Sequence, residues 1–234
     1  MMDELATVGV EITGKGAEKK RTQPRSLTAA NVLQKKRGRT VKLQNPILRQ
    51  LIGEAEAKGY WLIYGMEKNG KTWFTLQLAK DISLSEKVAY ISAEEGVDDS
   101  FKQACLRANI TASDKIVFDE YLSVDDIVEK FSKPKTPNII IIDNLTMYAD
   151  EIKSSRLKKD LLDRLPNKLI ILIAHEDRKK PYPAVAQMAR KLSKVIINVV
   201  GLRAFVVSRF SQGGHVDIEE RNAELYWGEV GQAS

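Results

Sequence analysis

Gly65-Met66-Glu67-Lys68-Asn69-Gly70-Lys71-Thr72 decides the fold, because this stretch satisfies the pattern G-x-x-x-x-G-K-[ST] at every fixed position. The glycines allow successive backbone N–H groups to curl around phosphate oxygens. The stretch lies between the apolar run 61–64 and an amphipathic segment that begins at Trp73, so it reads as a loop between a strand and a helix. Residues 65–73 are therefore predicted to form a phosphate-binding loop (P-loop) for a nucleoside triphosphate.

Two side chains of this loop have predicted roles of their own. Lys71 is expected to reach the β- and γ-phosphates, and the Thr72 hydroxyl is expected to hold Mg²⁺. Asp143 follows the apolar run 139–142 and supplies an acid at the tip of a buried strand. A carboxylate at that position can hold the same metal ion, so Thr72 and Asp143 are the predicted magnesium ligands.

Strand-like and helix-like segments alternate around the loop. Strands are predicted at 61–64, 88–92, 115–118, 138–143 and 169–174, and helices at 46–59, 73–82, 100–108, 124–131 and 154–165. This alternation predicts an α/β fold whose mostly parallel sheet is sandwiched by helices. The segments 195–200, 204–210 and 216–219 are strand-like without helices between them, which predicts a C-terminal antiparallel extension.

Composition excludes several classes of protein. The chain of 234 residues contains a single cysteine, Cys105, and two histidines, too few for an internal disulfide or a structural zinc site. No apolar run approaches the ~20 residues that span a bilayer, and the polar N-terminus lacks a secretory signal. The expected setting is the cytoplasm, without a membrane partner.

The net charge of +6 comes from the N-terminal segment. Residues 1–45 contain ten Lys or Arg against four Asp or Glu, whereas the rest of the chain contains 27 of each. Residues 1–40 are predicted to be a basic flexible arm and residues 41–234 a single domain that carries the P-loop. Two interpretations of the arm stay open: a solubilising tail, or a segment that grips phosphate or a neighbouring subunit.

The strand 88–92 is followed by Ala93, Glu94 and Glu95, and this arrangement resembles the RecA/KaiC/DnaB class of P-loop ATPases. In that class a glutamate at this strand end activates the attacking water. The resemblance implies a RecA-like fold, ATP as the nucleotide and Glu94 or Glu95 as the catalytic base. The residues themselves do not distinguish adenine from guanine.

The resemblance extends to two further residues. His175 follows the strand 169–174 and resembles the sensor of the γ-phosphate in this class. Arg209, within Val206-Val207-Ser208-Arg209, resembles the arginine that DnaB- and RadA-like proteins insert into a neighbour's active site, although Val207 replaces the usual lysine. Ring or filament assembly, with Arg209 acting in trans, is therefore expected.

The segment 176–182 lies where RecA-like proteins carry a DNA-binding loop. Its bases and aromatic residue suit contacts to a phosphate backbone and stacking on bases, and the residues concerned are Arg178, Lys179, Lys180 and Tyr182. A solvated charged loop would have the same composition.

The resemblance covers roughly residues 45–215 and is nearest to short, core-only RecA-like ATPases of phages and mobile elements. It implies an ATP-hydrolysing protein that acts with single-stranded DNA in recombination or replication, as a helicase- or annealing-type enzyme. Two alternatives remain open: a nucleotide-gated adaptor or loader for a replication or transposition partner, and a KaiC-like signalling ATPase.

Overall fold

The computed structural model describes residues 26–228, which divide into two units between Arg37 and Gly38. The described part of the first unit contains a short helix, α1 (Ala29–Leu33), capped by the side chain of Thr28. The predicted arm therefore lies mostly outside the described residues. Arg39 and Thr40, assigned to the arm by the sequence, lie in the second unit, where Ala57 N donates to Arg39 O at 2.9 Å and Thr40 forms a β-bridge with Glu56.

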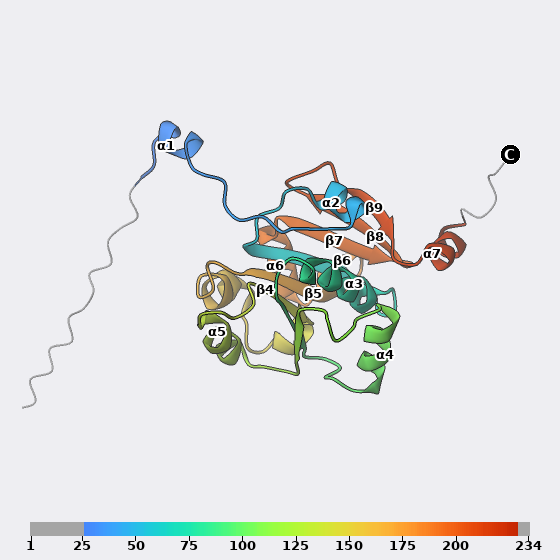
Figure 1. The fold of residues 1–234 in the computed structure, drawn as a ribbon. Helices are drawn as coiled ribbons and strands as arrows, with labels where there is room; N and C mark the ends of the chain where they lie inside the picture. Colours follow the sequence, from blue (N-terminus) through green and yellow to red (C-terminus); the bar gives the residue numbers. More distant parts are fainter. Residues whose placement is uncertain (1–25, 229–234) are drawn as a thin grey trace, which may run out of the picture. The chain divides into compact units, whose positions relative to one another are not determined.

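The second unit is built on a nine-stranded sheet with the order β3-β2-β4-β5-β1-β7-β8-β9, and β6 pairs with β5 (Figure 1). Strands β1 to β5 and β7 pair in parallel, whereas β6, β8 and β9 pair antiparallel. The predicted mostly parallel sheet with a C-terminal antiparallel extension is thus confirmed. The strands are β1 (Gly59–Gly65), β2 (Val88–Ser92), β3 (Ile116–Asp119), β4 (Ile139–Asp143), β5 (Leu169–Asp177), β6 (Lys180–Tyr182), β7 (Val195–Val200), β8 (Arg203–Ser208) and β9 (Gly214–Asp217).

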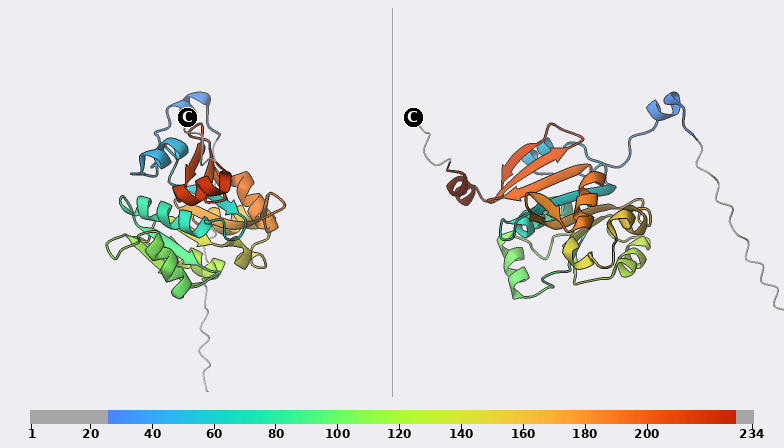
Figure 2. Two further views of the ribbon diagram at one scale, coloured as in Figure 1. Left: turned by 90° about the vertical axis from the view of Figure 1, so that its right-hand side faces the viewer. Right: turned by 180° about the vertical axis from the view of Figure 1, so that it is seen from behind.

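Helices cover both faces of this sheet, as the views in Figures 1 and 2 show. One face packs against α2 (Pro46–Ile52), α3 (Lys71–Ser83) and α4 (Asp99–Arg107). The other packs against α5 (Val124–Ser132), α6 (Ala184–Leu192) and the helical turns η1 (Leu145–Tyr148), η2 (Ser154–Arg156) and η3 (Lys158–Leu162). Helix α7 (Glu220–Trp227) follows β9. No helix among residues 26–228 is long and apolar enough to cross a membrane.

The run of isoleucines in β4 is explained by this layering. Successive side chains of a strand point to opposite faces, so Ile139 and Ile141 enter the core under α3 while Ile140 and Ile142 enter the core under α5. Both faces are apolar because both are covered. Asp143 is the first polar residue of the run, and it lies at the carboxyl edge of the sheet.

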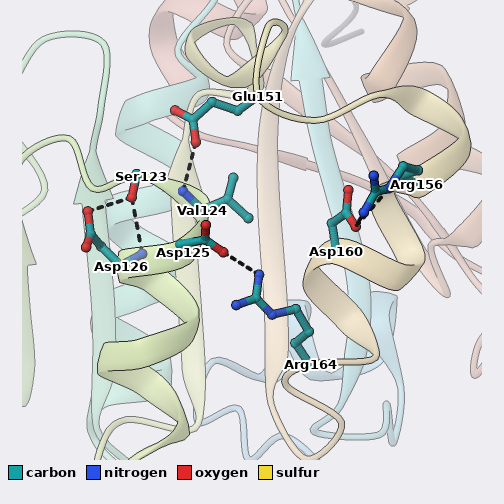
Figure 3. Close-up of polar contacts among 8 residues, drawn as sticks. All are labelled: Ser123, Val124, Asp125, Asp126, Glu151, Arg156, Asp160 and Arg164. Atoms are coloured by element: carbon teal, nitrogen blue, oxygen red, sulfur yellow. Dashed lines mark hydrogen bonds and ion pairs between the residues drawn. The ribbon is translucent and has the colours of Figure 1, made fainter.

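Polar contacts tie α5 to the segment that follows β4 (Figure 3). Ser123 caps the helix, and the Val124 backbone N–H donates to Glu151 Oε2 at 2.9 Å. Arg164 forms an ion pair with Asp125 at 2.6 Å. Exposed ion pairs contribute only about 0–1 kcal/mol, so this pair adds little to the stability of the fold.

The predicted helix 154–165 is wrong as a continuous α-helix. It consists of the 3₁₀ turn η2 followed by the π-helical turn η3, and neither has a side-chain N-cap. Leu157, Leu161 and Leu165 are all buried, which produces the helical spacing in the sequence. Packing of these leucines sets the path of the chain, and the missing caps leave its hydrogen bonding irregular.

Other element boundaries also differ from the prediction. The predicted helix 46–59 ends at Gly53, which has φ 74° and lies so close to Phe210 that a Cβ would approach the Phe210 carbonyl oxygen at 2.4 Å. Strand β5 continues to Asp177, three residues beyond the predicted strand end at Ala174, because β6 pairs with its end. Helices α6 and α7 were not predicted.

Candidate active site

The P-loop connects β1 to α3, and its geometry requires both fixed glycines. Gly70 adopts φ 95°, and Lys68 adopts φ 59°. A Cβ at Gly65 would lie 2.2 Å from the Val199 carbonyl oxygen of the neighbouring strand, and one at Gly70 would lie 2.7 Å from Leu202 Cδ2. The loop therefore packs tightly against β7 and the turn after it, while its backbone curls at the start of α3.

The side chain of Asn69 holds the P-loop in place through two hydrogen bonds. Its Oδ1 accepts a hydrogen bond from the Gly201 backbone N–H at 2.7 Å, and its Nδ2 donates to the Glu67 carbonyl at 3.0 Å. These contacts join the loop to the turn between β7 and β8. A curled, pre-ordered backbone of this kind is the concave cradle that binds phosphate oxygens.

Lys71 lies inside the curl of the loop. Only 7% of its surface is exposed, and its Nζ donates to the Met66 carbonyl at 2.9 Å. Burial lowers the pKa of Lys71 below its ordinary value, while Asp143 and Glu94 act in the opposite direction. A buried ammonium group at a helix N-terminus suits a polyanionic ligand.

Asp143 is held at the edge of the sheet by two hydroxyl groups. Tyr90 Oη donates to its Oδ2 at 2.6 Å, and Thr72 Oγ1 donates to the same oxygen at 3.2 Å. Burial raises the pKa of Asp143 to about 6, against the effect of these two hydrogen bonds. A carboxylate and a hydroxyl in contact are hard oxygen ligands, so the pair fits Mg²⁺ shared with phosphate oxygens.

Glu94 and Glu95 both follow β2, but their surroundings differ. Glu94 Oε1 lies 3.1 Å from His175 Nε2, and the amide of Asn144 contacts the Glu94 carboxylate as well. For Glu95, burial raises the pKa above its ordinary value, and the neighbouring Glu94 raises it further. The contacts to His175 and Asn144 favour Glu94 of the two as the candidate base.

These groups line a pocket of about 810 Å³. The P-loop contributes Glu67, Lys68, Gly70, Lys71, Thr72 and Trp73. The strand ends contribute the predicted residues Glu94, Glu95, Asp143 and His175. Of the remaining predicted loop residues, Gly65 and Asn69 contact the β7–β8 region, and Met66 contributes its carbonyl to Lys71.

Sequence reasoning missed several residues of the pocket. They come from α4, from the position after β4, from the β7–β8 turn and from α7: Ser100, Ala104, Arg107, Asn144, Leu202 and Asn222. Arg107 lies over the ring of Trp73 at 5.3 Å from its centroid. Tyr90, which supports Asp143 from beneath the pocket, was also missed. Its position follows from the strand register, because Ser92 pairs with Asp143 and Tyr90, two residues earlier, faces the same side of the sheet.

The predicted DNA-binding residues lie on a β-hairpin beside this site. Arg178 (φ 48°) and Lys179 (φ 62°) form the tight turn between β5 and β6, and Lys180 and Tyr182 are exposed on β6. None of these residues lines the pocket. The segment predicted as a loop is therefore an ordered hairpin in which His175 pairs with Tyr182.

Arg209 lies away from the pocket of its own chain. It is exposed, follows β8, and donates its backbone N–H to the Lys194 carbonyl just before β7 begins. Strand β7 runs parallel to β1, whose opposite end carries the P-loop. Arg209 is thus at the other edge of the sheet from Lys71.

Comparison with solved structures identifies the fold. A KaiC-like protein, PH0186 from Pyrococcus horikoshii OT3, matches with a TM-score of 0.54 at 17% identity, over 77% of this chain and 93% of that chain. The flagellar accessory protein FlaH from Methanocaldococcus jannaschii matches with a TM-score of 0.52 at 16% identity, over 76% and 91% of the two chains. An ATPase domain matches with a TM-score of 0.51 at 15% identity, over 71% and 83%.

The chain therefore has the fold of RecA-like P-loop ATPase domains, as the residues around Glu94 had indicated. No protein-family model matches the sequence. A search of curated proteins likewise gives no match. At 15–17% identity the likeness establishes the fold, and the activity has to be argued from the site.

Proposed function

We propose that this chain binds Mg·ATP and hydrolyses it while acting with single-stranded DNA in recombination or replication. One observation carries the proposal: Lys71, Thr72 and Asp143 meet Glu94 in a single pocket although they come from three separate parts of the sequence. A glycine-rich loop with no catalytic role would not require the Glu94 carboxylate, after β2, in the same pocket as Lys71 and Thr72.

The chain's own residues divide the binding work. Backbone N–H groups of residues 66–72 and the Lys71 ammonium hold the phosphates, and Thr72 and Asp143 provide oxygens for Mg²⁺. Bound magnesium supplies positive charge that offsets the charge developing on the phosphate oxygens. Trp73 and Arg107 line the part of the pocket next to α4, where their flat side chains can stack on the adenine ring of the nucleotide.

Hydrolysis in this site requires a base and a contact to the terminal phosphate. Glu94 accepts a proton from a water molecule as the water oxygen bonds to the γ-phosphorus, and the bond from that phosphorus to the β–γ bridging oxygen breaks, giving ADP and phosphate. His175 is placed to contact the terminal phosphate. The contacts to His175 and Asn144 place Glu94 for this role, and burial raises the pKa of the other candidate, Glu95.

Assembly is part of the proposal. Arg209 lies at the opposite edge of the sheet from its own P-loop, so it can contribute charge only to the site of a neighbouring copy. Head-to-tail contacts of this kind generate rings or filaments. The hairpin with Arg178, Lys179 and Lys180 would contact DNA, and its pairing of Tyr182 with His175 provides a direct connection to the nucleotide site.

The test is ATP hydrolysis with and without single-stranded DNA, using Lys71→Ala as the binding-deficient control. We expect Lys71→Ala to abolish ATP binding and single-stranded DNA to stimulate the wild-type protein. Light scattering with ATP and DNA should detect assemblies. If the wild-type protein binds no labelled ATP, the proposal is wrong; if it remains monomeric with both ligands, the role of Arg209 is wrong.

One observation favours a nucleotide-gated adaptor as the second candidate. None of Arg178, Lys179, Lys180 and Tyr182 lines the pocket, which suits a site whose turnover does not depend on DNA. An adaptor would bind ATP and change its affinity for a replication or transposition partner, with hydrolysis unaffected by DNA. The same hydrolysis assay separates the two candidates.

A further inference from the structure

Asn144 occupies a buried position between two predicted catalytic residues. It follows β4 directly and is only 1% exposed. Its Oδ1 accepts a hydrogen bond from the Thr146 backbone N–H at 2.7 Å, which caps η1. Because a backbone N–H can only donate, this contact fixes the orientation of the amide: Oδ1 faces η1, and the NH₂ group faces the pocket.

The NH₂ group of Asn144 contacts side chains from both neighbouring strands. Its Nδ2 donates to Glu94 Oε2 and lies 2.9 Å from His175 Nε2. The sheet order β2-β4-β5 explains this arrangement, since Asn144 follows the central strand, Glu94 follows β2, and His175 lies in β5 beyond its last residue paired with β4. One amide therefore joins side chains from the two strands on either side of β4.

Asn144 and Glu94 both contact His175 Nε2, and the two contacts require opposite protonation of this nitrogen. His175 Nε2 accepts from Asn144 only if it carries no proton, whereas its 3.1 Å contact with Glu94 Oε1 is a hydrogen bond only if it does. The amide of Asn144 is fixed as a donor, so it favours the tautomer with the proton on Nδ1, whereas the Glu94 carboxylate favours the proton on Nε2. Nδ1 is buried without a hydrogen-bond partner among the described residues, so the contacts of Nε2 decide between the two tautomers. A phosphate oxygen accepts hydrogen bonds and so favours the other tautomer, with the proton on Nε2.

We propose that Asn144 is a positioning residue that holds the Glu94 carboxylate in place and sets the tautomer of His175, so that contact of His175 with a terminal phosphate is coupled to the orientation of the base. The coupling to phosphate rests on the function proposed above. The control of the His175 tautomer by Asn144 does not depend on that function, because it follows from contacts within the nucleotide-free protein.

Two variants remove the donors of Asn144 in complementary ways. Asn144→Asp keeps an acceptor for Thr146 N but has no NH₂ group, and Asn144→Leu keeps the side chain uncharged at similar volume. Asn198→Asp is the matched control, because Asn198 Nδ2 also donates to a glutamate, Glu176 Oε2 at 2.9 Å, and neither residue lines the pocket.

The first readout is ¹⁵N NMR of the imidazole rings in nucleotide-free protein at about pH 9, above the ordinary pKa of histidine of about 6.5. The chain contains two histidines, so His215→Gln assigns the spectrum. We expect the proton of His175 on Nδ1 in the wild-type protein and in Asn198→Asp, and on Nε2 in both variants of Asn144. A wild-type proton on Nε2, or a tautomer unchanged by both substitutions, would overturn the proposal.

The second readout is single-turnover hydrolysis together with the binding of a nonhydrolysable ATP analogue. We expect both variants to lower the hydrolysis rate about 10- to 100-fold, the range typical of removing a residue that orients a catalytic group, with the affinity for the analogue changed less than about threefold. In a Glu94→Gln background the same substitutions should have no further effect, and additive losses would contradict the coupling. If the wild-type protein does not hydrolyse ATP, the proposed function fails while the NMR result still decides the role of Asn144.

Discussion

Replacement of Tyr90 by Phe tests whether the protein prepares Asp143 for a metal ion. The substitution removes one oxygen atom, the hydroxyl that donates to Asp143 Oδ2 at 2.6 Å. The ring can stay in place, since it packs against Phe101 and Phe118 at centroid distances of 5.5 and 5.9 Å. The change is therefore confined to the support of one buried carboxylate.

The size of the effect follows from that hydrogen bond. A hydrogen bond to a charged group contributes about 1.5–3 kcal/mol, and about 1.4 kcal/mol corresponds to a tenfold change in an equilibrium constant. Burial already raises the pKa of Asp143 to about 6, and the Tyr90 bond opposes this. Without it, the ionised carboxylate that binds Mg²⁺ is less stable, and Mg²⁺ affinity should fall about 10- to 100-fold.

The assay is the binding of a fluorescent ATP analogue titrated with Mg²⁺. We expect the Mg²⁺ concentration at half-saturation to increase at least about tenfold in Tyr90→Phe. Tyr60→Phe is the matched control, because it also removes a buried hydroxyl, which donates to the Leu157 carbonyl at 3.0 Å in the other core. An unchanged half-saturation in Tyr90→Phe, or an equal increase in the control, would refute the reasoning.

Three further predictions concern the same unit. In metal-free protein the pKa of Asp143 is about 6 against an ordinary 3.8, so the folded state binds the extra proton and the free energy of unfolding should fall as pH rises from about 4 to 6. Urea unfolding in EDTA should show that the wild-type protein loses on the order of 3 kcal/mol over this window relative to Asp143→Asn; equal slopes in the two proteins would contradict the assignment. Gly65→Ala, whose Cβ would lie 2.2 Å from the Val199 carbonyl oxygen, should lower nucleotide affinity at least about tenfold with the fold retained by circular dichroism, and parental affinity would show that the close approach does not matter. The double variant Lys179→Ala, Lys180→Ala should weaken binding of single-stranded DNA without changing ATP binding. The slope of log affinity against log salt concentration should become shallower by about 0.7 for each phosphate that the variant no longer neutralises. If only removal of residues 1–40 has this effect, the DNA site lies in the arm.

Local chemistry explains why parts of the site could be read from the sequence. The P-loop is a contiguous stretch in which local geometry requires particular residue types, such as glycine at position 70, where φ is 95°. Asp143 could be found because it ends a run of buried isoleucines. The parallel sheet could be predicted because strands buried on both faces give apolar runs that recur with helices between them.

The β5–β6 hairpin and the broken helix show where local patterns fail. Residues 178–182 have the composition of a solvated loop, but pairing of β6 with β5 orders them. Leu157, Leu161 and Leu165 have helical spacing, yet their segment has no N-cap and forms 3₁₀ and π turns. Pairing with the neighbouring strand β5 outweighs the composition in the first case, and the absence of a local cap outweighs the helical spacing in the second.

The sequence by itself determined that a glycine-rich loop of the pattern G-x-x-x-x-G-K-T precedes a helix, that the sheet is mostly parallel, and which acids stand at or just after strand ends. Only the tertiary structure decided which of those strand ends are neighbours. The order β2-β4-β5 places Asn144 between Glu94 and His175, and the pleat turns Tyr90 toward Asp143. Strand order arises from packing of the whole chain, because parallel strands are joined through crossovers whose length does not specify which neighbour they pair with.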